Sequence, residues 1–342
     1  MKRLLALALS AMMVLSMAAC STDGGSSSSA AENSSSAAEP QEKITVQVGG
    51  LKGPTAMGMV KLMEDDAAGT TYSDYEFTLA GAPDEITAKV ITGELDIAAV
   101  PTNVASVLYN KTEGQVEIAA LNTLGVLYLV ETGDGIQSVE DLRGKTIYST
   151  GKGSTPEFAL NYILEQNGLT VGTDVFVEYK SEHAELASLL AAGQADIAVL
   201  PQPFVTSVLT QNENVRIALD LTAEWDKVTT DGSKLTMGAL VVRSDFAKEH
   251  PEALAKFMEE YQASTEYVTD EANLDEVAAL IEKYDIIKAA VAKVALPYCN
   301  IVCITGEEMK TATQGFLNIL YGANPSSIGG ALPNDDFYYL GN

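Results

Sequence analysis

The chain has 342 residues, and 47 acidic against 21 basic residues give it a formal net charge of −26. Nucleic-acid binding needs clustered Lys and Arg, so this balance argues against it, although a small-ligand pocket can still carry a local field that opposes the global one. The length is sufficient for a large core and suggests two lobes or domains.

The first segment predicts export. Lys2 and Arg3 precede an apolar run over residues 4–19, which is shorter than the ~20 residues that a membrane span needs, so residues 1–19 are interpreted as a signal peptide. Met17-Ala18-Ala19-Cys20 resembles a bacterial lipobox, in which the Cys is lipidated after cleavage. An ordinary cleaved signal followed by a chance Cys is the alternative.

Residues 20–43 consist largely of Ser, Ala, Glu and Gly. Such a composition cannot bury a core, so we expect a disordered tether with a mean reach of about 25 Å. No later segment is apolar enough to span a bilayer, so we expect membrane attachment through the lipid anchor only, on the extracytoplasmic face.

From residue 44 onward, strand-like and helix-like patterns alternate twice, which is typical of α/β architecture. The predicted strands are residues 44–48, 75–79, 95–100, 116–121 and 126–130, then 146–149, 175–179, 195–200, 215–219 and 239–242. The predicted helices are residues 55–66, 83–92 and 102–110, then 156–167, 183–192 and 203–211, with a largely helical remainder over 251–342.

The two halves are similar in sequence at an offset of 100 residues. Lys52-Gly53-Pro54-Thr55 matches Lys152-Gly153-Ser154-Thr155, and residues 93–101 match residues 193–201. Each K-G-x-T stretch lies between a strand and a helix, where unpaired backbone N–H groups and the helix dipole favour an anion or polar oxygen. We expect two lobes, residues 44–124 with 238–342 and residues 125–237, with crossings near 122–125 and 235–238.

These features resemble an ABC-transporter solute-binding lipoprotein of the nitrate, taurine, alkanesulfonate and thiamine-precursor group. The resemblance is carried by Cys20, the Ser-rich tether, Lys52–Thr55, the two blocks at 93–101 and 193–201, and Ser138-Val-Glu-Asp-Leu-Arg-Gly-Lys145. It implies a two-lobe, type II periplasmic-binding-protein-like α/β fold, each lobe a mostly parallel sheet flanked by helices. It also implies a small-molecule solute held between the lobes, and an ABC permease with its ATPase as partners.

The function that follows is capture of a small polar solute, with an anionic, sulfonate- or nitrate-like one favoured, by a monomer. The alternatives are a thiamine-pyrimidine precursor or related heteroaromatic compound, or a ligand-sensing lobe of a signalling partner. Nucleophile-elbow, zinc-protease and P-loop motifs are absent from the sequence, so no enzyme activity, cofactor or metal is expected.

Open α/β sheets bind ligands at the carboxyl ends of their strands. That rule nominates as ligand-binding residues Lys52, Gly53, Pro54, Thr55, Thr102, Asn103, Thr123, Lys152, Gly153, Ser154, Thr155, His183, Gln202, Pro203 and Trp225. The threonines and Asn103 can instead cap helices, and the two lysines can be solvated loop residues. His183 can be a neutral histidine at a helix start, and Trp225, in a loop over 221–227, can pack on a lobe edge.

Cys299 and Cys303 remain after Cys20. In an exported protein such a pair can form a disulfide, but the three-residue spacing leaves pairing open. With two histidines in the whole chain, a zinc site is not expected.

Overall fold

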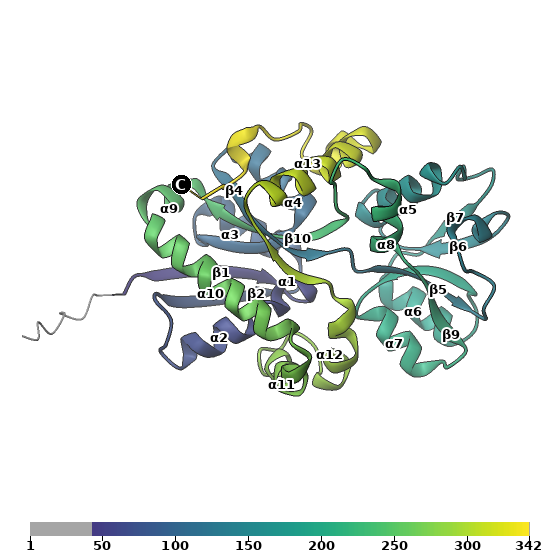
Figure 1. Cartoon of the computed structure of the whole chain (residues 1–342), viewed down its shortest axis with the longest axis horizontal. Coiled ribbons are helices and arrows are strands. Elements are labelled where there is room, and N and C mark those ends of the chain that lie inside the picture. The colour runs from purple at the N-terminus through teal and green to yellow at the C-terminus, as the bar shows by residue number, and fades with distance from the viewer. Residues whose placement is uncertain (1–42, 342) are drawn as a thin grey trace, which may run out of the picture. The chain divides into compact units, whose positions relative to one another are not determined.

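The computed structural model describes residues 43–341, so the predicted signal peptide, Cys20 and nearly all of the predicted tether lie outside the described residues. Within that range the strands form two sheets with helices packed on them, which confirms the expected two-sheet α/β architecture (Figure 1). No described helix is both long and apolar enough to cross a membrane.

Sheet A has six strands. In spatial order they are β11 (Ile301–Ile304), β4 (Val116–Leu124), β10 (Thr236–Arg243), β3 (Ile97–Pro101), β1 (Thr45–Leu51) and β2 (Asp74–Ala80). The helices that accompany it in sequence are α1 (Pro54–Met57), α2 (Val60–Ala67), α3 (Pro83–Thr92), α4 (Thr102–Lys111), α9 (Ser244–Glu249), α10 (Pro251–Thr269), α11 (Leu274–Lys283), α12 (Ala289–Ala295) and α13 (Gly306–Ala323).

Sheet B has five strands. Their order is β7 (Phe176–Tyr179), β6 (Thr146–Ser149), β8 (Ile197–Pro201), β5 (Leu127–Thr132) and β9 (Val215–Asp220). Its helices are α5 (Thr155–Gln166), α6 (His183–Ala191), α7 (Phe204–Gln211) and α8 (Leu221–Val228). Short 3₁₀ turns lie at Val139–Leu142, Glu271–Asn273, Leu296–Tyr298, Pro325–Ile328 and Asp335–Phe337.

Both sheets are mixed, and most strands of each run in one direction, as expected. Strand β1 runs parallel to β2 and β3, and β6 runs parallel to β7 and β8. Strands β10 and β5 run antiparallel to both of their neighbours. The reason is topological: β5 follows β4 and β10 follows α8, so each enters its sheet from the other half of the protein and inserts in the opposite direction.

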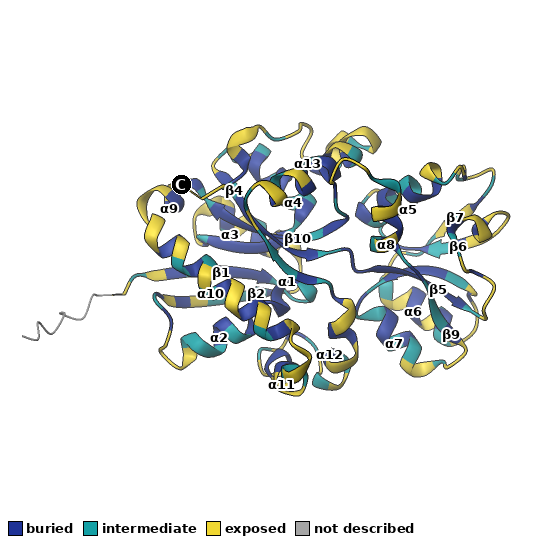
Figure 2. Ribbon diagram, in the orientation of Figure 1, coloured by how far each residue is buried: buried dark blue, intermediate teal, exposed yellow. Residues whose placement is uncertain are grey.

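The buried side chains follow the strands. The central strands β1, β3, β4 and β5 are almost continuously buried, and the outer faces of the helices are exposed (Figure 2). Strands β3, β4 and β5 are therefore apolar over most of their length rather than alternating, because both of their faces are covered.

One predicted helix is interrupted. Residues 55–66 form two helices, α1 and α2, with a break at Gly58. The Ser264 hydroxyl from α10 donates to the Gly58 carbonyl oxygen (2.7 Å) and accepts from the Leu62 N–H (3.0 Å), so it takes the place of a direct i to i+4 hydrogen bond. A side chain at Gly58 would meet the Tyr261 hydroxyl at 2.8 Å, so this close approach requires glycine.

The C-terminal remainder is largely helical, as predicted, but it also contains β11, which extends sheet A beside β4. Residues 221–227, which we predicted as a loop, belong to helix α8. The Asp220 carboxylate caps this helix by accepting from the Thr222 N–H at 2.8 Å.

Candidate functional site

A pocket of about 400 Å³ lies where loops from the two sheets meet. Its lining residues lie at or after the carboxyl ends of β1, β2, β3, β6 and β7, or close to the crossings between the sheets. We call it the inter-sheet pocket, and it is lined by Leu51, Lys52, Pro54, Thr55, Pro83, Pro101, Asn103, Thr123, Val126, Gly151, Ser154, Thr155, Pro156, His183 and Met237.

The pocket brings together part of the set nominated from the sequence. The nominated residues that line it are Lys52, Pro54, Thr55, Asn103, Thr123, Ser154, Thr155 and His183. The nominated residues outside its lining are Gly53, Thr102, Lys152, Gly153, Gln202, Pro203 and Trp225. Lining a pocket does not establish contact with a solute, so the binding roles stay predictions.

The threonines at the helix starts do not cap those helices. The N-cap residues of α1, α4 and α5 are Gly53, Pro101 and Ser154, and none of them makes a side-chain capping bond. Thr55 and Thr155 are the second and first residues of their helices, each largely buried, and both line the pocket. Capping therefore does not account for either hydroxyl.

Glycine is required at both K-G-x-T loops by backbone conformation. Gly53 has φ 125° and Gly153 has φ 79°, a region that side-chain-bearing residues rarely adopt. A Cβ at either position would meet no atom within 4 Å. The conformation of the turn, rather than lack of space, therefore explains the two glycines.

Asn122 supports the sheet A side of the pocket, and the sequence did not nominate it. Its Nδ2 donates to the Thr55 carbonyl oxygen (2.9 Å), and its Oδ1 accepts from the Thr123 hydroxyl (3.2 Å). Gly238 on β10 packs directly beneath these groups, because a Cβ there would meet Asn122 Oδ1 at 2.3 Å and Thr55 Cγ2 at 2.4 Å. The sequence signal available for Asn122 was its place at the predicted crossing over residues 122–125.

The charged groups near the pocket are largely neutralised. The Lys52 ammonium pairs with Asp285, and this pair holds the pKa of the Asp285 carboxyl below its usual value. Lys152 instead lies over the Tyr179 ring, 5.7 Å from its centroid, and does not line the pocket. No Asp or Glu is among the described residues that line the pocket.

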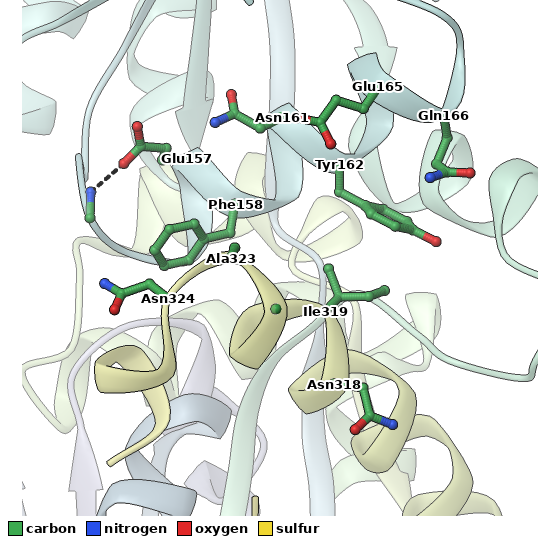
Figure 3. A pocket seen from close by; sticks show the side chains of 12 residues that line it. Glu157, Phe158, Asn161, Tyr162, Glu165, Gln166, Asn318, Ile319, Ala323 and Asn324 are labelled. Carbon is green, nitrogen blue, oxygen red and sulfur yellow. Dashed lines mark hydrogen bonds between the residues drawn. The ribbon is translucent and has the colours of Figure 1, made fainter. Parts of the chain in front are cut away.

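In the second K-G-x-T loop, one backbone N–H donates to a side chain outside the pocket lining. The Gly153 N–H donates to the Glu157 carboxylate at 2.5 Å (Figure 3). The Ser154 hydroxyl donates to the Gly151 carbonyl oxygen at 2.6 Å. Of this loop, Thr155 is therefore the hydroxyl best placed for a solute.

His183 begins helix α6 and lines the pocket as a half-buried ring. Its Nδ1 lies 2.6 Å from the Thr150 hydroxyl oxygen, and its ring centroid lies 5.2 Å from that of Phe204. Burial lowers the pKa of His183 below its usual value, with a weaker opposing effect of Glu182. The ring is therefore neutral near pH 7.

Trp225 does not form a wall of the pocket, which corrects that part of the prediction. It is completely buried in α8, packed against Tyr162 of α5 (4.8 Å between ring centroids) and Phe316 of α13 (6.0 Å). Gln202 is also buried, and its Oε1 accepts from the Thr206 N–H and hydroxyl. The Trp225 ring thus packs inside the protein, while Nε2 of Gln202 is buried without a hydrogen-bond partner among the described residues.

A larger groove of about 750 Å³ lies between α5 and α13 (Figure 3). Phe158, Tyr162 and Ile319 give it apolar surface, while Glu157, Glu165 and several amide side chains give it acceptors. Gly153 is the one nominated residue that lines this groove. The other lining residues belong to α5, to α13 or to Asn324 directly after it, and not to the loops that follow the strands. The inter-sheet pocket, rather than this groove, is the candidate functional site.

Cys299 and Cys303 are both free thiols in the structure. Burial raises the pKa of Cys299 to about 12 and that of Cys303 to about 11. Within residues 43–341 there is no group of His, Cys, Asp and Glu side chains that could hold a metal ion.

Known proteins of similar sequence or structure support the assignment of the fold. A putative binding protein from Brucella abortus is 25% identical over 207 residues, which is 60% of this chain and 61% of that protein. The chain thus matches less than two thirds of the length of these curated relatives. An ABC transporter structure from Parabacteroides distasonis is 25% identical with a TM-score of 0.73, over 87% of this chain and 99% of that chain.

The periplasmic aliphatic sulphonate binding protein SsuA from Escherichia coli shares the fold at 15% identity, with a TM-score of 0.65 over 85% of this chain and 92% of that chain. The two-lobe, type II fold expected from the sequence is consistent with these neighbours. The profile of one family, described as "ABC transporter, phosphonate, periplasmic substrate-binding protein", matches residues 70–284. The chain therefore belongs to the phosphonate family of periplasmic substrate-binding proteins of ABC transporters.

Proposed function

We propose that the protein is the solute-binding component of an ABC importer, which captures a small polar solute in the inter-sheet pocket and delivers it to a permease. The observation that carries this proposal is the convergence of the two K-G-x-T loops, 100 residues apart in sequence, on one pocket. Family membership supports the transport role and gives no reason to expect catalysis.

The lining favours a solute with an oxygen-rich, anionic head and a small organic body. Thr155 offers a hydroxyl group, the Thr55 hydroxyl makes a long 3.4 Å bond to the Leu51 carbonyl oxygen, and Lys52, paired with Asp285, brings an ammonium group. The absence of carboxylates from the described lining disfavours a cationic solute. Apolar walls, including Leu51, Val126 and Met237, suit an organic body better than a bare inorganic ion.

The alternative of a pyrimidine or related heteroaromatic solute loses its main support. A heteroaromatic ring needs an aromatic side chain to stack on, and Trp225, the nominated indole, is completely buried in α8.

Delivery requires that two lobes close on the solute. We propose that residues 44–124 together with 238–342 form one lobe and that residues 125–237 form the other. Gly125 lies at one crossing, where its carbonyl oxygen accepts from the Thr222 hydroxyl (3.0 Å) and from Asn300 Nδ2 (2.5 Å). The Tyr128 hydroxyl also donates to the Tyr298 carbonyl oxygen at 2.8 Å. The bonds to Asn300 and Tyr298 join this crossing to the C-terminal segment, and the bond from Thr222 joins it to α8, so closure would pivot about them.

We further propose that the protein is exported and anchored by lipid at Cys20, on the extracytoplasmic face of the membrane, as a monomer. The support is the sequence of residues 1–43, together with a family of periplasmic binding proteins.

Calorimetric titration of purified protein with ethylphosphonate, ethanesulfonate, an aminopyrimidine and an alkylamine tests the solute class. We expect an oxyanion to bind and Thr55→Ala and Thr155→Ala each to weaken it about 10- to 150-fold, because a hydrogen bond to a charged group contributes ~1.5–3 kcal/mol. Thr102→Ala is the matched control, since Thr102 is buried beside the pocket but does not line it. Binding of the amine alone, or equal losses in all three variants, would contradict the proposal.

A further inference from the structure

The contact between Thr150 and His183 has a consequence for how the pocket recognises oxygen. Thr150 directly follows β6, is 2% exposed and does not itself line the pocket. Its hydroxyl oxygen lies 2.6 Å from Nδ1 of His183, whose ring does line the pocket. The ring edge that carries Nε2 is therefore the edge available to a solute.

We propose that Thr150 is a positioning residue that fixes His183 as the neutral Nε2–H tautomer, so that the pocket presents a hydrogen-bond donor, and not an acceptor, to the solute. This inference rests on the proposed function for its biological meaning, because it names the group that selects an oxygen-bearing head. It assigns no chemistry to Thr150 itself.

The direction of the hydrogen bond follows from the burial of Thr150. A neutral imidazole carries one N–H, and the bond made at one nitrogen decides which of the two carries it. Among residues 43–341, Nδ1 of His183 is the acceptor found for the Thr150 hydroxyl. If Nδ1 carried the proton instead, the hydroxyl hydrogen would lie buried without a partner, which is costly. The hydroxyl therefore donates, and the imidazole proton resides on Nε2.

The surroundings of the ring also favour the neutral form. His183 is the first residue of α6, where the positive end of the helix dipole opposes a second proton on the ring. The Phe204 ring packs against it and excludes water from one side. Glu182 and Glu185, the acidic residues at the start of the same helix, oppose this effect, and both are exposed.

A neutral Nε2–H donor discriminates between solutes by hydrogen-bond type. A phosphonate, sulfonate or carboxylate oxygen accepts from it directly. An ammonium head has no acceptor: it would face a donor and would have to force the other tautomer, in which Nδ1 can no longer accept from the Thr150 hydroxyl. The pair thus favours acceptor heads without adding a net charge to the pocket.

Nitrogen-15 NMR of the imidazole rings tests the assignment in the intact protein, since the chain has two histidines and His250 serves as the internal reference. We expect His183 at pH 7.5 to show the neutral Nε2–H pattern. In Thr150→Val we expect a mixture of tautomers and about 3- to 10-fold weaker binding of ethylphosphonate or ethanesulfonate, as for the loss of one neutral hydrogen bond. Thr150→Ser should restore both, and the melting temperature checks that each variant is folded.

An Nδ1–H or doubly protonated His183 in the free protein would overturn the inference, as would an unchanged ring spectrum and unchanged affinity in folded Thr150→Val. The test of the His183 tautomer can succeed or fail independently of the proposed function. If wild-type protein binds neither oxyanion, the proposed solute class fails, whereas the spectrum of the free protein still decides the tautomer.

Discussion

Adding one methyl group at Gly238 should damage the pocket from beneath. In Gly238→Ala the new Cβ would meet Asn122 Oδ1 at 2.3 Å, Thr55 Cγ2 at 2.4 Å and Thr123 Oγ1 at 2.9 Å. Real Cβ atoms do not approach other atoms this closely, so strand β10 or all three neighbours must move. Two of those neighbours, Thr55 and Thr123, line the pocket.

The expected cost follows from overpacking of a well-packed interior, about 1–3 kcal/mol of unfolding free energy. A mid-range loss of ~2 kcal/mol corresponds to a fall in melting temperature of about 3 °C in a compact unit that spans Lys43–Asn342. Because the strain falls on two lining residues, we also expect the affinity for an oxyanion solute to fall by at least about tenfold, which is ~1.4 kcal/mol.

Gly81→Ala is the matched control, because a Cβ there meets open space and the residue lies at the same edge of sheet A, after β2. Melting by circular dichroism and titration calorimetry measure both quantities. Wild-type stability and affinity in Gly238→Ala would refute the packing argument. A large loss of stability without loss of affinity would show that the strain does not reach Thr55 and Thr123.

Three further predictions address other parts of the protein. Trp225, the single tryptophan, is buried in α8 against α5 and α13, so its fluorescence emission should be blue-shifted and should change when the proposed lobes close on solute. Identical emission spectra with and without saturating solute would argue against movement between α13 and the two helices α5 and α8. Because burial lowers the pKa of His183 from its usual 6.5, the unfolded chain binds more protons just below that pH, so thermal stability should fall as pH drops through about 6.5, and His183→Gln should flatten this fall. Cys20→Ser should release the protein from membranes with an unchanged melting temperature; a wild-type protein that stays on membranes without a lipid adduct by mass spectrometry would contradict the anchor.

The sequence predicted the elements that its local patterns encode. The strand and helix alternation, and the two K-G-x-T loops after β1 and β6, lie where the repeat suggested. The strand-end rule also led to Thr55, Thr155 and His183, because residues that follow parallel strands share one edge of a sheet whatever the rest of the chain does.

The errors arose where contacts distant in sequence decide the structure. The break at Gly58 depends on Ser264, about 200 residues away, and the support of the pocket by Asn122 depends on Gly238. Trp225 looked like a loop residue because its neighbours are polar, yet it lies on the buried side of helix α8 with Leu221 and Glu224. Lys152 matched Lys52 in sequence, but the Tyr179 ring beside it has no counterpart in the first half, where the matching residue is Leu79.

Identification of the small molecule that co-purifies with the protein from its native host, by mass spectrometry after denaturation, tests the central claim most directly. Our account predicts one small compound in near-equal amount to the protein, bearing a phosphonate, sulfonate or carboxylate head, and predicts its loss from the Thr55→Ala, Thr155→Ala double variant. Recovery of a cationic amine as the only tightly bound compound would contradict the account.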